Sequence, residues 1–216
     1  RVAAELGAAL PAESILFVAA SMPVRDVETF FPRRDDGGPR VLAHRGANGI
    51  DGTVAAAYGA AASRLAPVVL LIGDVALAHD VGGLLDGARL GVPLTIVLVD
   101  NGGGAIFDFL PVATQTDVFE RHVATPTGLD VARLADLAGA RYVAVDSVAA
   151  LRAGLEDAHP SATTILHVCT DRARNVDLHR RVWTAVADAL RDAGRTPEQG
   201  PPPAAARSTP AAAPGA

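Results

Sequence analysis

The sequence contains no lysine, a single cysteine (Cys169) and few aromatic residues, which make up 4% of the chain. Because one cysteine cannot form a disulfide within the chain, a reducing cytoplasm is the simplest compartment for the protein. All permanently positive side chains are arginines, and the net charge of −5 offers no basic surface to nucleic acid or anionic lipid. No apolar run reaches the roughly 18–20 residues needed to cross a bilayer. We therefore expect neither a nucleic-acid nor a membrane partner.

Two sequence patterns are also missing. No Gly-x-Gly-x-x-Gly follows the first apolar run and no Walker sequence occurs, which argues against a nucleotide-binding oxidoreductase of the Rossmann type. Residues 1–10 lack the layout of a signal peptide and resemble a helix without an initiating Met, which indicates a piece of a longer protein. Residues 195–216 are rich in Pro and Ala, so we expect one domain over residues 1–194 followed by a disordered tail.

Short aliphatic runs alternate with helix-like stretches along the chain. The runs are apolar almost throughout, which is typical of strands buried on both faces of a parallel sheet. This alternation predicts an α/β fold: a doubly wound, mainly parallel sheet with helices on both faces. The expected strands cover residues 15–19, 41–44, 68–72, 94–99, 142–145 and 164–168, and the expected helices cover 54–65, 75–90, 131–138, 149–158 and 182–193. Residues 101–126 form a long irregular connection, and such loops are usually functional.

Polar residues and glycines follow two successive strands of the expected sheet. Gly73-Asp74-Val75-Ala76 comes after the third strand, and Asp100-Asn101 with three glycines comes after the fourth. Ligands of open parallel sheets bind at these carboxyl ends. A carboxylate, a carboxamide and exposed backbone suit Mg²⁺ and a phosphate group. Asp74 could instead cap a helix and the glycines could simply form a turn. Their occurrence on successive strands favours a binding site.

The spacing of these residues resembles a known motif. Gly73-Asp74, with Asn101 placed 27 residues after Asp74, is similar to the metal motif of thiamine-diphosphate enzymes. The segments HRGANGIDG (44–52) and NGGGAIFDFLP (101–111), with Ser21 and Arg25 after the first strand, resemble the 2-succinyl-5-enolpyruvyl-6-hydroxy-3-cyclohexene-1-carboxylate synthase (MenD) family of menaquinone biosynthesis. The resemblance covers residues 14–170, and its most specific segment is RGANGIDG.

This resemblance implies a cofactor and two substrates. The family uses thiamine diphosphate with Mg²⁺ or Mn²⁺ to decarboxylate 2-oxoglutarate and to join the product to isochorismate. By the resemblance, Ile50 would be a catalytic residue that supports the bent form of the cofactor. The implied metal ligands are Asp74, Asn101 and the carbonyl of Gly103; the implied cofactor contacts are Gly73, Asp74, Val75, Ala76, Gly104 and Ile106. The implied substrate residues are Ser21, Arg25, Arg45, Phe107 and Leu110, with Arg25 and Arg45 also catalytic.

The chain also departs from the family pattern. Asp100 stands where the first Asn of the motif is expected, Val75-Ala76 replaces a Gly or a hydroxyl residue, and Ala105 replaces a longer polar residue. The family further uses a glutamate on a separate pyrimidine-binding domain, at a site formed between two subunits. We therefore expect this chain to belong to a homodimer or larger homo-oligomer and to be inactive alone.

Other functions remain open at this point. Within the same superfamily, an acetolactate-synthase-like or 2-oxoacid decarboxylase domain is the alternative, although paired arginines favour substrates with more carboxylates. A non-catalytic Rossmann-like binding or dimerisation domain is the alternative outside it. We assign no role to His44, interpret His79 and Asp80 as buried-polar or capping residues, and interpret Cys169 as a small hydrophobic residue.

Overall fold

The computed structural model describes residues 1–44 and 49–193. The chain divides into two compact units, Arg1–Ala173 and Arg174–Ala216. The first unit contains the sheet. The described part of the second unit is helix α9 (Arg172–Asp192) from Arg174 onward. Arg45 and the expected tail at residues 195–216 lie outside the described residues. Among the described helices, none has the length and apolar character that crossing a membrane requires.

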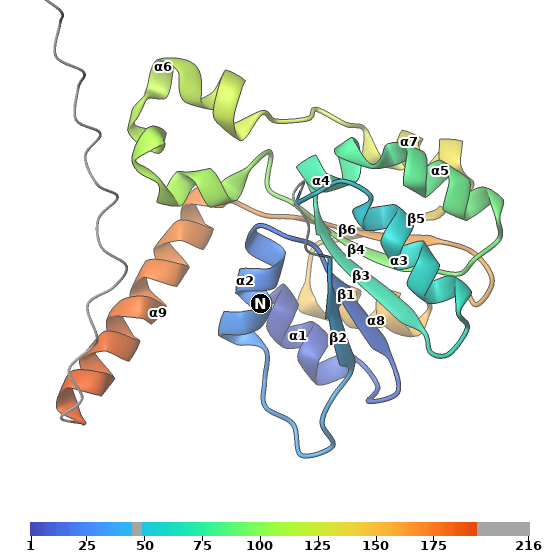
Figure 1. Ribbon diagram of the computed structural model, residues 1–216, viewed down its shortest axis with the longest axis horizontal. Helices are drawn as coiled ribbons and strands as arrows, with labels where there is room; N and C mark the ends of the chain where they lie inside the picture. The colour runs from blue at the N-terminus through green and yellow to red at the C-terminus, as the bar shows by residue number, and fades with distance from the viewer. Residues whose placement is uncertain (45–48, 194–216) are drawn as a thin grey trace, which may run out of the picture. The chain divides into compact units, whose positions relative to one another are not determined.

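The first unit is built on a six-stranded sheet in the order β2-β1-β3-β4-β6-β5 (Figure 1). Every pairing between neighbouring strands is parallel. The central strands consist almost entirely of buried aliphatic residues, as expected for strands covered on both faces. The strands are β1 (Ile15–Val18), β2 (Arg40–Ala43), β3 (Val68–Gly73), β4 (Thr95–Asp100), β5 (Arg141–Val145) and β6 (Thr164–Cys169). The prediction of a parallel α/β sheet is confirmed.

Helices cover both faces of the sheet, so the doubly wound arrangement is confirmed as well. Successive residues of a strand point to opposite faces, and the fully buried Leu70 and Leu71 of β3 belong to different core clusters. The Leu70 cluster includes side chains of α3 (Thr53–Ala62), α4 (Asp74–His79), α5 (Val81–Arg89) and α7 (Val131–Ala138). The Leu71 cluster includes side chains of α1 (Val2–Ala9), α2 (Met22–Phe30) and α8 (Val148–Glu156).

The single helix expected over residues 75–90 is wrong, because the chain leaves the helix at Asp80 and forms α4 and α5 instead. The Asp80 carboxylate accepts hydrogen bonds from the backbone N–H groups of Val54 and Ala55, at 2.7 and 2.9 Å. These N–H groups belong to the first turn of α3 and have no partner within that helix. Asp80 thus caps a different helix, which agrees with the capping role expected for it.

Helices α2 and α9 also differ from the sequence-based expectation. The segment after β1 forms α2, which was not predicted, with Pro23 in the first turn, where proline is tolerated. Helix α9 begins at Arg172, ten residues before the predicted start at residue 182. The polar composition of residues 172–181 hid the helical spacing of its apolar positions.

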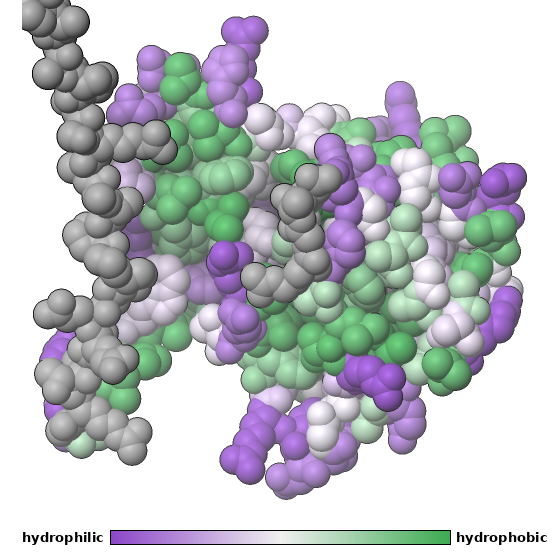
Figure 2. Space-filling view, viewed as in Figure 1, coloured by the Kyte–Doolittle hydropathy of each residue, from purple (hydrophilic) through white to green (hydrophobic). Residues whose placement is uncertain are grey.

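The long connection after β4 contains short turns rather than one long element. It comprises the 3-10 helices η1 (Ala105–Phe109) and η2 (Pro111–Thr114), helix α6 (Thr116–Phe119) and the π-helical turn η3 (Glu120–Ala124). Arg172 holds it to the end of β6, since its guanidinium donates to Glu120 at 2.5 Å and lies 3.9 Å from Asp108. Figure 2 shows apolar side chains gathered over this connection, which carries the exposed Phe107, Leu110 and Val118.

Removing the Asp80 cap tests its contribution to the fold. We expect Asp80→Ala to lower the free energy of unfolding by about 1–2 kcal/mol, because two N–H groups at the start of α3 lose their acceptor. Asp86→Ala is the matched control: Asp86 is 75% exposed and only pairs with Arg89, at 3.4 Å, so its loss should cost at most about 0.5 kcal/mol. Urea denaturation of both variants measures the difference, and equal losses would show that Asp80 is not a cap.

Candidate functional site

The main pocket lies where the order of strands in the sheet reverses. From β1 the chain passes to β2 on one side and then returns to β3 on the other side of β1. Such a reversal opens a crevice at the carboxyl ends of the two central strands, where ligands bind. A cavity of about 660 Å³ occupies this position and is lined by residues that follow β1, β2, β3 and β4. The cavity thus lies where the sequence predicts a ligand site, and ligand binding there stays a prediction.

The segment after β1 forms one wall of the cavity and brings Ser21 and Arg25 together. Ser21 has φ 72° and ψ −134°, a backbone conformation that side chains rarely adopt. A guanidinium nitrogen of Arg25 donates to the carbonyl oxygen of Ser21 at 2.7 Å. Both residues line the cavity, as does Glu28 of the same helix. Strained backbone of this kind is concentrated at functional sites.

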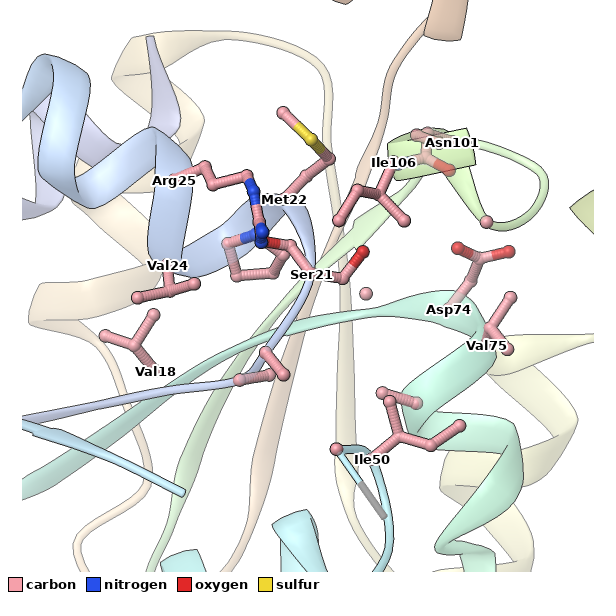
Figure 3. Close-up of a pocket in the computed structure, with 18 of the residues that line it drawn as sticks. Val18, Ser21, Met22, Val24, Arg25, Ile50, Asp74, Val75, Asn101 and Ile106 are labelled. Atoms are coloured by element: carbon pink, nitrogen blue, oxygen red, sulfur yellow. The ribbon is translucent and has the colours of Figure 1, made fainter. Parts of the chain in front are cut away.

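The opposite wall carries two buried oxygen atoms that lack hydrogen-bond partners. Asp74 is only 5% exposed, yet its Oδ2 has no partner among the described residues, and neither does Oδ1 of Asn101. In Figure 3 the carboxylate of Asp74 lies below Asn101, and Ser21 points towards the same space from across the pocket. Buried polar atoms nearly always have partners, and oxygen donors of this type are the ligands that Mg²⁺ prefers. The residues present therefore fit a divalent cation.

The surroundings of Asp74 oppose its negative charge. Burial raises the pKa of the Asp74 carboxyl, and the nearby charge of Asp100 raises it further. Hydrogen bonds from the backbone of Asp74, Val75 and Gly103 act in the opposite direction but do not prevail. A cation between the two unpartnered oxygens would offset this penalty.

Glycines allow the loop after β4 to pack closely beside Asp74. Gly103 has φ 136°, and a Cβ at this position would lie 2.6 Å from the carbonyl oxygen of Ala124. The Gly104 N–H donates to the same oxygen at 2.7 Å. A side chain at Gly103 would therefore displace the turn that carries Asn101, so glycine is required here for steric as well as conformational reasons.

Most of the residues expected at the site line this one cavity. Those lining it are Ser21, Arg25, Ile50, Gly73, Asp74, Val75, Ala76, Asn101, Gly103, Gly104, Ile106 and Phe107. Leu110, which follows the end of η1, does not line it and is 48% exposed. Arg45 lies outside the described residues. The structure brings the other twelve together, although their roles stay predictions.

Among the lining residues with ionisable side chains, Glu28 and His44 were not assigned from the sequence. Glu28 lies on α2, which was not expected to be a helix, so its position could not be inferred. His44 also lines the cavity, and its buried Nδ1 has no hydrogen-bond partner. Its place directly after β2 was the available signal, and the same carboxyl-end rule that selected Asp74 would have selected it.

Comparison with known families agrees with this fold and site. The family model described as "Thiamine pyrophosphate enzyme, C-terminal TPP binding domain" matches residues 27–168, where TPP is thiamine pyrophosphate, another name for thiamine diphosphate. The chain belongs to this family of thiamine-diphosphate-dependent enzymes. A solved benzoylformate decarboxylase from Polynucleobacter necessarius superposes with a TM-score of 0.63 at 21% identity, over 79% of this chain and 32% of that one, and so shows the same fold.

Among curated proteins the chain is similar to 2-succinyl-5-enolpyruvyl-6-hydroxy-3-cyclohexene-1-carboxylate synthases. It is 46% identical to the enzyme of Myxococcus xanthus over 88% of this chain, and 43% identical to that of Chloroflexus aurantiacus over 89%. The matched regions make up 32% and 33% of those enzymes. The chain thus spans about a third of the length of the relatives it matches, and the resemblance to the MenD family is confirmed.

The raised pKa of Asp74 predicts how the ligand-free protein responds to pH. A carboxyl whose pKa rises on folding binds its proton more tightly in the folded state than in the unfolded state. The Asp74 carboxyl therefore lowers the free energy of unfolding progressively as the pH rises from its ordinary pKa of 3.8 through the raised value. At neutral pH Asp74→Asn should therefore raise the thermal unfolding midpoint without metal or cofactor. Asp86→Asn, an exposed control, should leave the midpoint unchanged. A lower midpoint for Asp74→Asn would contradict this account.

Proposed function

We propose that this chain is the metal- and diphosphate-binding part of an enzyme that joins decarboxylated 2-oxoglutarate to isochorismate in menaquinone biosynthesis. The observation that carries the proposal is the pair of buried, unpartnered oxygens of Asp74 and Asn101 at the strand-order reversal. The similarity to the synthases supports this proposal, since those relatives are named for the product that such a reaction would form.

The metal and the diphosphate would share one end of the cavity. Mg²⁺, or Mn²⁺ in its place, would be held by the Asp74 carboxylate, the Asn101 amide oxygen and the Gly103 carbonyl. The backbone from Gly73 to Ala76 lines the same end and would contact the diphosphate, together with Gly104. When bound, thiamine diphosphate supplies the electron sink that decarboxylation and carbon–carbon bond formation need. The protein contributes position and charge.

The other end of the cavity would bind substrate carboxylates. The bond from Arg25 to the Ser21 carbonyl fixes the guanidinium at the cavity wall. A guanidinium has five N–H donors, so this bond leaves others for a carboxylate. Arg45 would supply a second cation. Ile50, Ile106 and Phe107 line the cavity and would exclude water from the reacting centre, with Ile50 supporting the cofactor. We propose a substrate contact for Leu110 only at the outer edge.

A thermal-shift experiment tests the cofactor site. Thiamine diphosphate with Mg²⁺ should raise the unfolding midpoint, because a ligand present at 100 times its Kd stabilises the folded state by about 2.7 kcal/mol. The shift should require both components and should be lost in Asp74→Ala and Asn101→Ala, whereas Asp86→Ala keeps it. A chain ending at residue 194 should show the same shift, since we propose that residues 195–216 are a tail outside the binding domain. A full shift in Asp74→Ala would refute the metal assignment.

The activity of the 216-residue chain by itself is a separate test. The relatives have about two thirds of their length beyond the matched region. We propose that turnover needs a pyrimidine-binding domain and a second subunit of a homo-oligomer, packed against the exposed apolar side chains of residues 107–118. Incubation of the 216-residue chain with thiamine diphosphate, Mg²⁺ and 2-oxoglutarate should therefore release no CO₂. Catalytic release of CO₂ would show that the chain is sufficient.

A further inference from the structure

A second group of metal-binding side chains lies at the carboxyl ends of β4 and β6, next to the main cavity. Asp100, His167 and Cys169 each offer one ligand atom, and these atoms lie within 4.8 Å of one another. The strand register places Asp100 opposite Cys169. His167 and Cys169 are two residues apart on β6, so their side chains share one face of the sheet. Two adjacent parallel strands thus present an oxygen, a nitrogen and a sulfur donor together.

Contacts at both ring nitrogens fix the orientation of the His167 imidazole. Its Nε2 lies 3.0 Å from Oδ2 of Asp100 and 3.6 Å from Sγ of Cys169. Its Nδ1 lies 3.0 Å from the hydroxyl oxygen of Tyr142 on β5. In the metal-free protein Nε2–H donates to the Asp100 carboxylate and Nδ1 accepts from the Tyr142 hydroxyl; when a metal replaces the proton on Nε2, Nδ1–H donates to Tyr142 instead. Histidines that ligate metals usually have such a partner on the other nitrogen, and it fixes the ring orientation.

We propose that Asp100, His167 and Cys169 bind Zn²⁺, at a site that shares no ligand with the Asp74–Asn101 pair. A mixed thiolate, imidazole and carboxylate set suits Zn²⁺, whereas Mg²⁺ prefers oxygen ligands alone. The side chains of His167 and Asp100 are 13% and 27% exposed and Cys169 is exposed, so water can reach the fourth position. This inference does not depend on the proposed function, because it uses none of the residues assigned to the cofactor.

A catalytic triad is the other chemistry that this residue set could suggest. In a triad the acid contacts one imidazole nitrogen and the nucleophile contacts the other. Here Asp100 and Cys169 both approach Nε2, and Tyr142 occupies the side of Nδ1. The ligand atoms of Asp100, His167 and Cys169 instead converge on one point, which is the arrangement found in metal sites.

The single cysteine makes the proposal directly testable with Co²⁺, a spectroscopic substitute for Zn²⁺. Because Cys169 is the only cysteine in the chain, a thiolate-to-cobalt charge-transfer band can arise only from this residue. Titration of the reduced 216-residue protein should give this band with a one-to-one end point, and Zn²⁺ should abolish it. Cys169→Ser should eliminate the band, and Tyr142→Phe should weaken Co²⁺ binding by roughly 10-fold, since it removes the partner that orients the imidazole.

Matched variants separate this site from others in the chain. His167→Asn should weaken Co²⁺ binding at least as much as Tyr142→Phe, whereas His159→Asn, at an exposed histidine, should leave it unchanged. Asp74→Ala should also leave the band unchanged, even though it removes the thiamine-diphosphate shift. Circular dichroism checks that each variant is folded, and Zn²⁺ competition against a chromogenic chelator provides a second readout for Cys169→Ser. No cobalt band, or a band that depends on Asp74 rather than His167, would overturn the proposal.

Discussion

The buried carboxylate of Asp74 is the constraint around which this domain is organised. It lies at the end of β3, is 5% exposed, and faces an amide oxygen of Asn101 that also lacks a partner. Its three backbone donors do not prevent its pKa from rising. Burial without a partner opposes the charge of this carboxylate, and a cation bound beside it would offset that cost. The loop geometry after β4, including the obligatory Gly103, serves to bring Asn101 beside it.

The wall of the cavity on the side of Ile50 depends on a chain of polar contacts. The buried hydroxyl of Thr53 donates to the Ile50 carbonyl at 2.9 Å, and the next two N–H groups donate to Asp80. Asp80 can reach them only because the chain breaks between α4 and α5. Helix α4 therefore ends at His79, and Asp80, the next residue, holds the first turn of α3. Through Thr53, this turn also fixes the position of Ile50.

A single strand end, that of β4, contributes to both candidate metal sites. Asp100 contacts His167 on β6, and Asn101 faces Asp74 after β3. The Oδ1 atom of Asp100 also accepts from the N–H of Gly102 at 3.1 Å, which stabilises the turn that carries Asn101. Asp100, which departs from the family pattern, thus has a structural role in the loop of the first site and a ligand role in the proposed second one.

The sequence by itself determined the class of fold and most of the cavity. Continuous aliphatic runs defined the strands to within one or two residues, because the central strands are buried on both faces and carry no polar alternation. The carboxyl-end rule then selected Asp74 and Asn101 without knowledge of the sheet. The tertiary structure decided the rest. The break at Asp80 depends on N–H groups 25 and 26 residues earlier in the chain. Likewise, Asp100 meets His167 only because β6 inserts between β4 and β5. Local patterns cannot encode such neighbours, since strand order is set by how helices pack on the sheet.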